Sequence, residues 1–286
     1  MEGVTYFTMT LLLLFFLGIK DDLITLDPRK KLIAEIFTGI VLTYFTDIHF
    51  TNFHGFLGIT DIPVWLSYLT TVFLVVVILN SLNLIDGIDG LAASAGIIAT
   101  IVLGVWFWLA GDTGYSIMAA ALLGALIVFL RFNLSKGKNK IFMGDSGSLI
   151  IGFILAVMVI HFNEINTGSS PVHNLNSSPA ITIAILIVPL YDTLRVFTLR
   201  IWNRQNPFKG DNRHIHHLML RAGFSHRKTT FYMSLAHIII IAIAFMLDHI
   251  GIIWLSLALL FISLILTGFV QLLVYRHTER GVRSEE

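Results

Sequence analysis

The sequence has no cysteine and few charged residues. Without cysteine, the chain has no disulfide framework, no thiolate metal site and no cysteine nucleophile. Charged residues make up only 13% of its 286 residues, whereas hydrophobic residues make up 56%, and the mean hydropathy is +0.81. This composition excludes an ordinary soluble domain and indicates a polytopic membrane protein. No internal repeat or linker divides the chain, so we expect a single membrane-embedded domain over residues 1–286.

Apolar stretches long enough, or nearly long enough, to cross a bilayer recur along the chain. A transmembrane helix needs about 20 mostly apolar residues. Such stretches lie at residues 3–19, 32–46, 63–82, 91–110, 115–132, 148–162, 180–201, 230–248 and 251–275. The first lacks a basic region before it and a small-residue cleavage site after it, so we interpret it as a span and not as a signal peptide. The sequence predicts an all-α bundle of about nine transmembrane helices.

The basic residues lie on one side of this topology. Alternate connections and their flanks contain Lys20, Arg29, Lys30, Lys31, Arg131, Lys136, Lys138, Lys140, the segment from 200 to 228, Arg276, Arg280 and Arg283. The opposite connections, residues 47–62, 111–114, 163–179 and 249–250, contain no lysine or arginine. Because basic residues are retained on the cytoplasmic side, we expect the N-terminus outside and the C-terminus in the cytosol. Trp65, Trp106, Trp108 and Trp254 then form an outer aromatic belt.

Residues 80–90, Asn-Ser-Leu-Asn-Leu-Ile-Asp-Gly-Ile-Asp-Gly, place two carboxylates and two asparagines at the inner end of a span. A charge in the hydrocarbon costs ~2.5–3.5 kcal/mol and usually marks function. Gly87 and Gly90 directly follow Asp86 and Asp89, so the backbone can leave helical geometry there. We expect both carboxylates on a helix end or turn at the membrane surface. The alternative, a capped helix end, needs only one such residue.

The first inner connection contains the adjacent pair Asp21-Asp22. Neighbouring carboxylates repel unless a cation or proton intervenes, so the pair indicates a metal, a proton-transfer role or basic partners nearby. Asp27-Pro28 is ordinary helix-start chemistry. Lys31 and the two basic residues before it either anchor the chain at the interface or contact phosphate.

Asp145 lies between two glycines and before two hydroxyl side chains. This pattern suits a carboxylate on a tight turn that faces a hard cation, because Mg²⁺ takes one or two protein carboxylates and completes its shell with water and phosphate oxygens. An N-cap for the following helix is the alternative.

The longest inner connection, residues 202–228, contains Arg213, His214, His216 and His217. Basic and imidazole groups on a loop suit an anionic headgroup or a diphosphate. A transition-metal site is less favoured, because no thiolate or carboxylate lies at ligand spacing beside these histidines. His237, inside the eighth stretch, is interpreted as a packing residue.

These stretches resemble the polyprenyl-phosphate N-acetylhexosamine-1-phosphate transferases, and among them the bacterial undecaprenyl-phosphate GlcNAc-1-phosphate transferases of the WecA and TagO type. The matching motifs are Asp21-Asp22, Asn83-Leu-Ile-Asp86-Gly-Ile-Asp89-Gly, Phe142-Met-Gly-Asp145-Ser-Gly-Ser and His214-Ile-His216-His217. They occur in the family's order over some 200 residues and are highly specific together.

The resemblance implies roles for these residues. Asp145 and Asp86 would bind Mg²⁺, with Mn²⁺ as an alternative. The catalytic residues would be Asp21 and Asp22 at the lipid phosphate, Asp86 and Asp89 at the metal–diphosphate site, and His216. The substrate-binding residues would be Asn83, Asn133, Phe142, Arg213, His214 and His217, with Asn133 and Phe142 at the uridine.

The implied reaction transfers N-acetylhexosamine-1-phosphate, GlcNAc-1-phosphate above all, from a UDP-sugar to undecaprenyl or another polyprenyl phosphate and releases UMP. The implied place is the bacterial inner membrane, with the site facing the cytosol; no nucleic-acid partner is expected, and a homodimer is left open. The runner-up substrate is UDP-MurNAc-pentapeptide, although that branch carries three successive histidines. A cation- or proton-coupled transporter is the alternative from another class, but it would tend to hold its acids near mid-span in repeated broken helices.

The chain departs from the family pattern in one respect. Members usually have about two further spans before the Asp-Asp motif, with a Pro-x-x-Gly-Gly stretch between them, whereas here only residues 3–19 form a span before Asp21. We therefore expect an N-terminally shortened form, or one read from an internal Met, that is poorly active as given.

Overall fold

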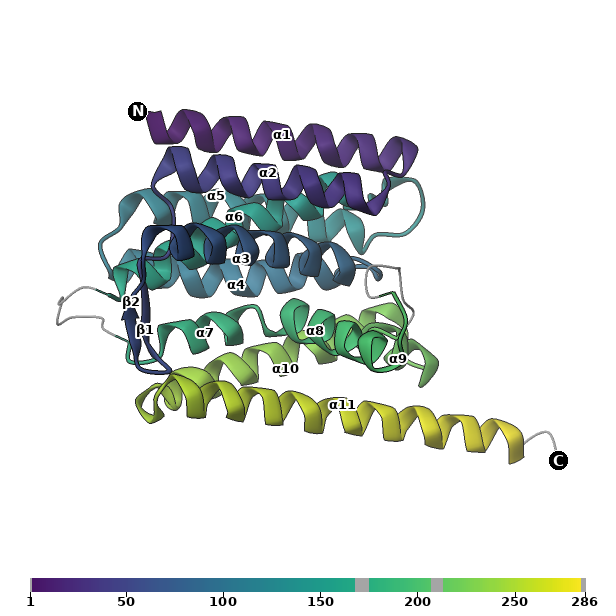
Figure 1. Ribbon diagram of the computed structural model, residues 1–286. Helices are drawn as coiled ribbons and strands as arrows, with labels where there is room; N and C mark the ends of the chain where they lie inside the picture. Colours follow the sequence, from purple (N-terminus) through teal and green to yellow (C-terminus); the bar gives the residue numbers. More distant parts are fainter. Residues whose placement is uncertain (1, 168–174, 207–212, 284–286) are drawn as a thin grey trace.

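The computed structural model describes residues 2–167, 175–206 and 213–283 (Figure 1). In chain order its elements are α1 (Glu2–Ile24), α2 (Pro28–Thr46), β1 (Asn52–Phe56), β2 (Ile59–Asp61), α3 (Val64–Ile85), α4 (Leu91–Leu109), α5 (Thr113–Asn133), η1 (Gly137–Asn139), α6 (Gly144–Ile165), α7 (Ser178–Ile185), α8 (Ile187–Trp202), α9 (Ile215–Arg221), α10 (His226–Met246), η2 (Asp248–Ile250) and α11 (Ile252–Arg283). The prediction of a largely helical chain is confirmed; the short hairpin β1–β2 lies in the expected loop 47–62 and was not predicted.

Among the described residues, seven helices are long and apolar enough to cross a membrane, and an eighth span results if α7 and α8 count as one. The protein is therefore a polytopic membrane protein. The second expected span, residues 32–46, lies in α2, which is less apolar because its first two turns carry three basic residues and Glu35. The ninth span of the predicted topology thus depends on α2.

The long helices lie side by side, with α1 at one edge of the bundle and α11 at the other (Figure 1). Helix α6 runs through the interior, where Leu149, Phe153 and Phe162 are fully buried, and it contacts α1, α3 and α4. Close approach depends on small residues, as is common between membrane helices. A Cβ atom at Gly152 of α6 would lie 3.1 Å from the Cα atom of Leu79 in α3.

The expected span at residues 180–201 is not one continuous helix, because α7 and α8 are bent by 83° at their junction. Pro189 explains the break: it has no N–H, and its ring displaces the carbonyl group four residues earlier, that of Ile185. His237 of α10 donates a hydrogen bond from Nε2 to this carbonyl oxygen over 2.9 Å. His237 is buried, so its interpretation as a packing residue is confirmed.

The two ends of the bundle differ in composition. The connections α1–α2, α3–α4 and α5–α6 and the helix α9 lie at the end where the C-terminus emerges, and we call this the basic end (Figure 1). The opposite end, with the hairpin β1–β2, we call the hairpin end. The described parts of the connections at the hairpin end contain no lysine or arginine, so the one-sided charge of the sequence corresponds to one end of the structure.

Candidate active site

The last turns of α1 and the turn before α2 place Asp21, Asp22 and Asp27 at the basic end. Asp27 caps α2 by accepting a hydrogen bond from the Arg29 N–H over 2.9 Å, and Pro28 begins the helix, as predicted. The carboxylate of Asp21 accepts a hydrogen bond from the Leu26 N–H over 2.6 Å. Helix α1 extends past the expected end at residue 19 to Ile24, so Asp21 and Asp22 lie on its last turns and not in a loop.

Lys31 connects three of the four motifs. Its Nζ atom lies 2.9 Å from Oδ2 of Asp21, 3.0 Å from Oδ2 of Asp145 and 3.3 Å from Oδ1 of Asn83. Only 12% of the lysine side chain is exposed. Asn83 also donates from Nδ2 to Asp145 and, over 2.9 Å, to Oγ of Ser148. The sequence left Lys31 between an interface anchor and a phosphate contact, whereas the structure pairs it with two carboxylates.

Asp22 caps the helix that carries Asp145. Its carboxylate accepts hydrogen bonds from the Asp145 N–H over 2.7 Å, the Ser146 N–H over 3.2 Å and the Ser146 hydroxyl over 2.9 Å. Gly144 has φ +64°, and a Cβ atom there would lie 2.8 Å from the Asp22 carboxylate oxygens. The expectation of Asp145 on a tight turn is therefore corrected: Gly144 makes the turn, and Asp145 lies in the first turn of α6.

Asp86 ends α3 as its C-cap, as expected of a carboxylate at a helix end. Burial, together with the nearby carboxylates of Asp145, Asp22 and Asp89, raises the pKa of Asp86 to about 7. No hydrogen bond or ion pair joins its carboxylate to the described residues. This half-buried, uncompensated group is where an added cation would be most stabilised.

Asp89, in contrast, is paired. Its Oδ2 atom lies 2.6 Å from Nζ of Lys140 and 3.8 Å from Nδ1 of His226. Its backbone carbonyl accepts a hydrogen bond from the Thr230 hydroxyl over 2.8 Å. Asp89 thus ties the α3–α4 turn to α10 and to the connection before α6.

Asn133 and Phe142, both expected at the uridine, have different surroundings. Asn133 is buried; it accepts from the Gly90 N–H over 2.6 Å and donates to the Ile141 carbonyl over 2.8 Å. Its amide therefore joins two connections of the protein. Phe142 is 75% exposed, and Nζ of Lys140 lies 5.0 Å from its ring centre, so its ring is open to a ligand.

The histidine motif begins α9. His216 is 1% exposed and lies against the α3–α4 turn, since a Cβ atom at Gly87 would lie 2.5 Å from its Nε2 atom. Neither ring nitrogen of His216 has a hydrogen-bond partner among the described residues. Burial, followed by the charge of His217, lowers the pKa of His216 to about 4. The ring of His217 is 4.2 Å from that of His216, centre to centre.

Nη2 of Arg213 donates to Gln205 over 2.6 Å, and residues 207–212 of the expected loop lie outside the described residues.

No three histidine, aspartate or glutamate side chains in the described ranges converge closely enough to form a metal cage. Mg²⁺ needs only one or two protein carboxylates when phosphate and water supply the rest. The uncompensated carboxylate of Asp86 beside Asp145 fits such an ion. Their assignment as metal ligands stays a prediction.

Two charged residues near this site, Asp192 and Arg195, were missed by the sequence reasoning. Both lie in α8, and the Asp192 carboxylate accepts a hydrogen bond from Nδ1 of His214 over 3.1 Å. The signal was present, because charged residues within the apolar stretch 180–201 are as unusual as those in residues 80–90. Glu35 was also missed, although it is a charged residue within an apolar stretch; it is fully buried in α2 and accepts a hydrogen bond from Asn80.

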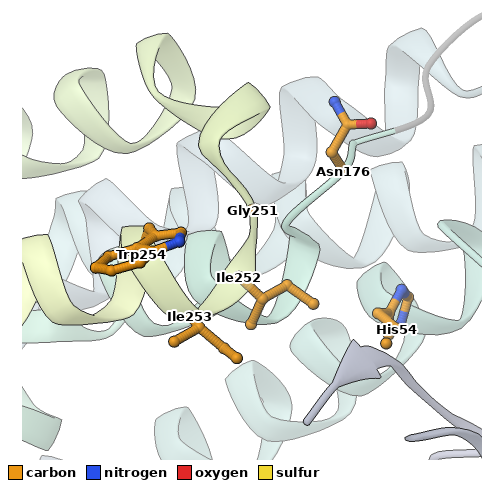
Figure 2. A pocket seen from close by; sticks show the side chains of 7 residues that line it. His54, Asn176, Gly251, Ile252, Ile253 and Trp254 are labelled. Atoms are coloured by element: carbon orange, nitrogen blue, oxygen red, sulfur yellow. The ribbon is translucent and has the colours of Figure 1, made fainter. Parts of the chain in front are cut away.

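A hollow of about 410 Å³ lies at the hairpin end, remote from these residues. Figure 2 shows His54 and Asn176 facing it together with Ile252, Ile253 and Trp254 of α11. Among the described residues that line it, none other than this histidine has an acidic or basic side chain. It does not extend the candidate site.

Comparison with known proteins agrees with the resemblance noted in the sequence. The chain is 31% identical to a probable undecaprenyl-phosphate N-acetylglucosaminyl 1-phosphate transferase of Bacillus subtilis (strain 168), over 92% of this chain and 70% of that protein. It is 27% identical to the undecaprenyl-phosphate alpha-N-acetylglucosaminyl 1-phosphate transferase of Escherichia coli (strain K12), over 90% of this chain and 69% of that protein. The sequence model of glycosyl transferase family 4 matches residues 4–163, more than half of the chain, and the protein therefore belongs to glycosyl transferase family 4.

Proposed function

We propose that the protein transfers GlcNAc-1-phosphate from UDP-GlcNAc to a polyprenyl phosphate such as undecaprenyl phosphate, an initiating step of cell-envelope polysaccharide synthesis. The activities named for its relatives support this proposal. The observation that carries it is the position of Lys31 between Asp21 and Asp145 at the end of an apolar bundle. A lipid headgroup and a water-soluble nucleotide sugar can meet only at such an end.

In the proposed reaction, an oxygen of the lipid phosphate forms a bond to the β-phosphorus of UDP-GlcNAc. The bond from that phosphorus to the oxygen bridging the α- and β-phosphates breaks, and its electron pair leaves with UMP. Catalysis of phosphoryl transfer is mostly positioning and charge stabilisation. The expected metal ion, Mg²⁺ or Mn²⁺, would be held by Asp145 and Asp86 and would neutralise developing charge on phosphate oxygens.

The chain's own residues divide the remaining tasks. Asp21 and Asp22 are proposed to act at the lipid phosphate and in its deprotonation, because they lie on the last turns of α1 at the basic end. Lys31 supplies positive charge between the two carboxylates. The exposed ring of Phe142 is available to stack on uracil, and His216, His217 and Arg213 are proposed to contact phosphate or sugar.

We further propose the predicted orientation, with nine spans when α2 and the bent pair α7–α8 are counted. The basic end would face the cytosol, because lysine and arginine are retained there. The site would then open to the cytosol at the bacterial inner membrane.

One assay tests the proposal. Purified protein in detergent is incubated with polyprenyl phosphate and UDP-[¹⁴C]GlcNAc, with Mg²⁺ or with EDTA, and both labelled lipid and UMP are measured. Mg²⁺-dependent formation of the two products in equal amounts is expected, and UDP-MurNAc-pentapeptide should not replace UDP-GlcNAc. Failure to form labelled lipid from any UDP-sugar, alongside ion or proton uptake in proteoliposomes, would instead favour the transporter.

A further inference from the structure

We infer that Asp192 is a positioning residue: from the bent helix α8, it orients His214 and the start of α9 toward the carboxylates of the site. The inference rests on the proposed function, since it assigns to the histidine segment the binding of the nucleotide sugar. Asp192 is 0% exposed, and its carboxylate is already bound by His214, the Ile215 N–H and Arg195. We therefore assign it a role that acts through His214 and not a contact with the substrate.

Among the described residues, the hydrogen-bond partners of Asp192 either belong to the segment that begins α9 or bind it in turn. Its Oδ2 atom accepts a hydrogen bond from Nδ1 of His214 over 3.1 Å. The Ile215 N–H donates to Oδ1 over 3.0 Å and to Oδ2 over 3.1 Å, so the same carboxylate caps α9. Arg195 of α8 pairs with Oδ1 over 3.1 Å and donates to the Arg213 carbonyl, which fixes the chain as it enters α9.

This pairing sets the tautomer of His214. A carboxylate only accepts hydrogen bonds, so the hydrogen is on Nδ1 of His214, and a carboxylate placed in this way holds an imidazole in one orientation. The ring of His214 lies nearly parallel to that of His216, 5.6 Å away and tilted by 12°. Because His216 packs against Gly87, beside Asp86, the order imposed by Asp192 reaches the edge of the carboxylate site.

The bend of α8 makes this arrangement available. Pro189 breaks the helix three residues before Asp192, and α8 packs on α3, the helix that ends at Asp86. The helix that ends at Asp86 therefore packs against the helix that holds His214. A straight helix over residues 178–202 would point Asp192 along a different direction.

The test compares Asp192→Asn with a matched control at the hairpin end, Asp112→Asn. Asp112 also caps a helix, accepting from the Tyr115 N–H over 3.0 Å, and also pairs with a histidine, His161, over 2.7 Å. We expect Asp192→Asn to raise the KM for UDP-GlcNAc at least tenfold while the KM for polyprenyl phosphate changes less than twofold. The control should leave both KM values within twofold of those of the native protein. If Asp192→Asn does not fold, Arg195→Lys (8% exposed side chain) replaces it, with a smaller shift in the same direction.

A second readout does not depend on activity. Trypsin cleaves after Arg213 and Arg221, which releases His214, His216 and His217 in one peptide, residues 214–221. Within this peptide, labelling of the buried His214 and His216 by diethyl pyrocarbonate, located by fragment-ion mass spectrometry, should be slow in the native protein. It should be at least fivefold faster in Asp192→Asn and unchanged in Asp112→Asn. Unchanged labelling in Asp192→Asn, or a KM for UDP-GlcNAc within twofold of native, overturns the inference. Absence of transfer by the native protein would refute the proposed function instead, while the labelling would still decide whether Asp192 holds the histidines.

Discussion

The carboxylate of Asp22 accepts a hydrogen bond from the backbone N–H of Asp145 over 2.7 Å, which joins the last turn of α1 to the first turn of α6. One acidic motif therefore places the other. Asp22→Ala should lower the free energy of unfolding by about 0.5–2 kcal/mol, the usual contribution of a helix cap, and Asp22→Asn should lose less because its amide oxygen still accepts. Thermal unfolding of both variants in one detergent measures this. Equal losses would mean that the cap does not depend on an oxygen at this position.

Asp145→Asn should leave the protein folded and abolish most of the transfer. The amide keeps the shape and the hydrogen-bonding oxygen but loses the charge expected to hold Mg²⁺ and paired with Lys31. We expect kcat to fall by about 10²–10³-fold, the effect of removing one strong electrostatic stabiliser. The exposed Asp61→Asn serves as a control. Activity near the native value at saturating Mg²⁺ would remove Asp145 from the metal site.

Lys31→Met should be strongly destabilising, because it leaves Asp21 and Asp145 close together without their cation. Breaking a buried ion pair from one side costs about 3–5 kcal/mol. The double variant Lys31→Met with Asp21→Asn should recover part of this loss, since one of the two carboxylates is then neutral. A double-mutant cycle on unfolding free energies measures the coupling, and strict additivity would show that the two side chains do not interact.

The expected apolar stretches predicted most helices because hydrophobic length is a local property of the chain. Pairing is not local. Nothing in the sequence near Lys31 indicates that its partners are ten residues earlier and in a helix 114 residues later, and Asp22 was not recognisable as a cap for α6. The bend at Pro189 was missed because the apolar character continues through it, so the stretch 180–201 looked like one span. Because the bend was missed, the role of Asp192 was missed too, since its partner His214 lies 22 residues further on.

The pair Asp112–His161 should make stability depend on pH at the acidic end of the range. Burial alone would raise the pKa of Asp112, but hydrogen bonds from His161 and the Tyr115 N–H outweigh it and lower the pKa below its ordinary 3.8. A carboxyl group with a lowered pKa stabilises the folded state above that ordinary value, and the contribution is lost as the pH falls through the folded-state pKa. The difference in unfolding free energy between the native protein and Asp112→Asn should be about 1 kcal/mol or less near pH 6 and should vanish well below pH 3.8. A difference that stays constant to the lowest pH would contradict this.

His237→Leu should lower the free energy of unfolding more when Pro189 is present than when it is replaced by alanine. In the native protein, Pro189 cannot donate to the carbonyl of Ile185, and His237 supplies the missing hydrogen bond over 2.9 Å. Leucine would leave that buried oxygen without a partner, at a cost of about 1–3 kcal/mol. In a Pro189→Ala background the new N–H of residue 189 can bond to Ile185, so the second loss should be smaller. Thermal unfolding of the four proteins measures the coupling, and equal costs of His237→Leu in both backgrounds would show that the histidine acts by packing alone.

Pro189→Ala should also straighten the junction of α7 and α8 and move Asp192, so its KM for UDP-GlcNAc should rise more than its KM for polyprenyl phosphate. A straightened helix with an unchanged KM would separate the bend from the site.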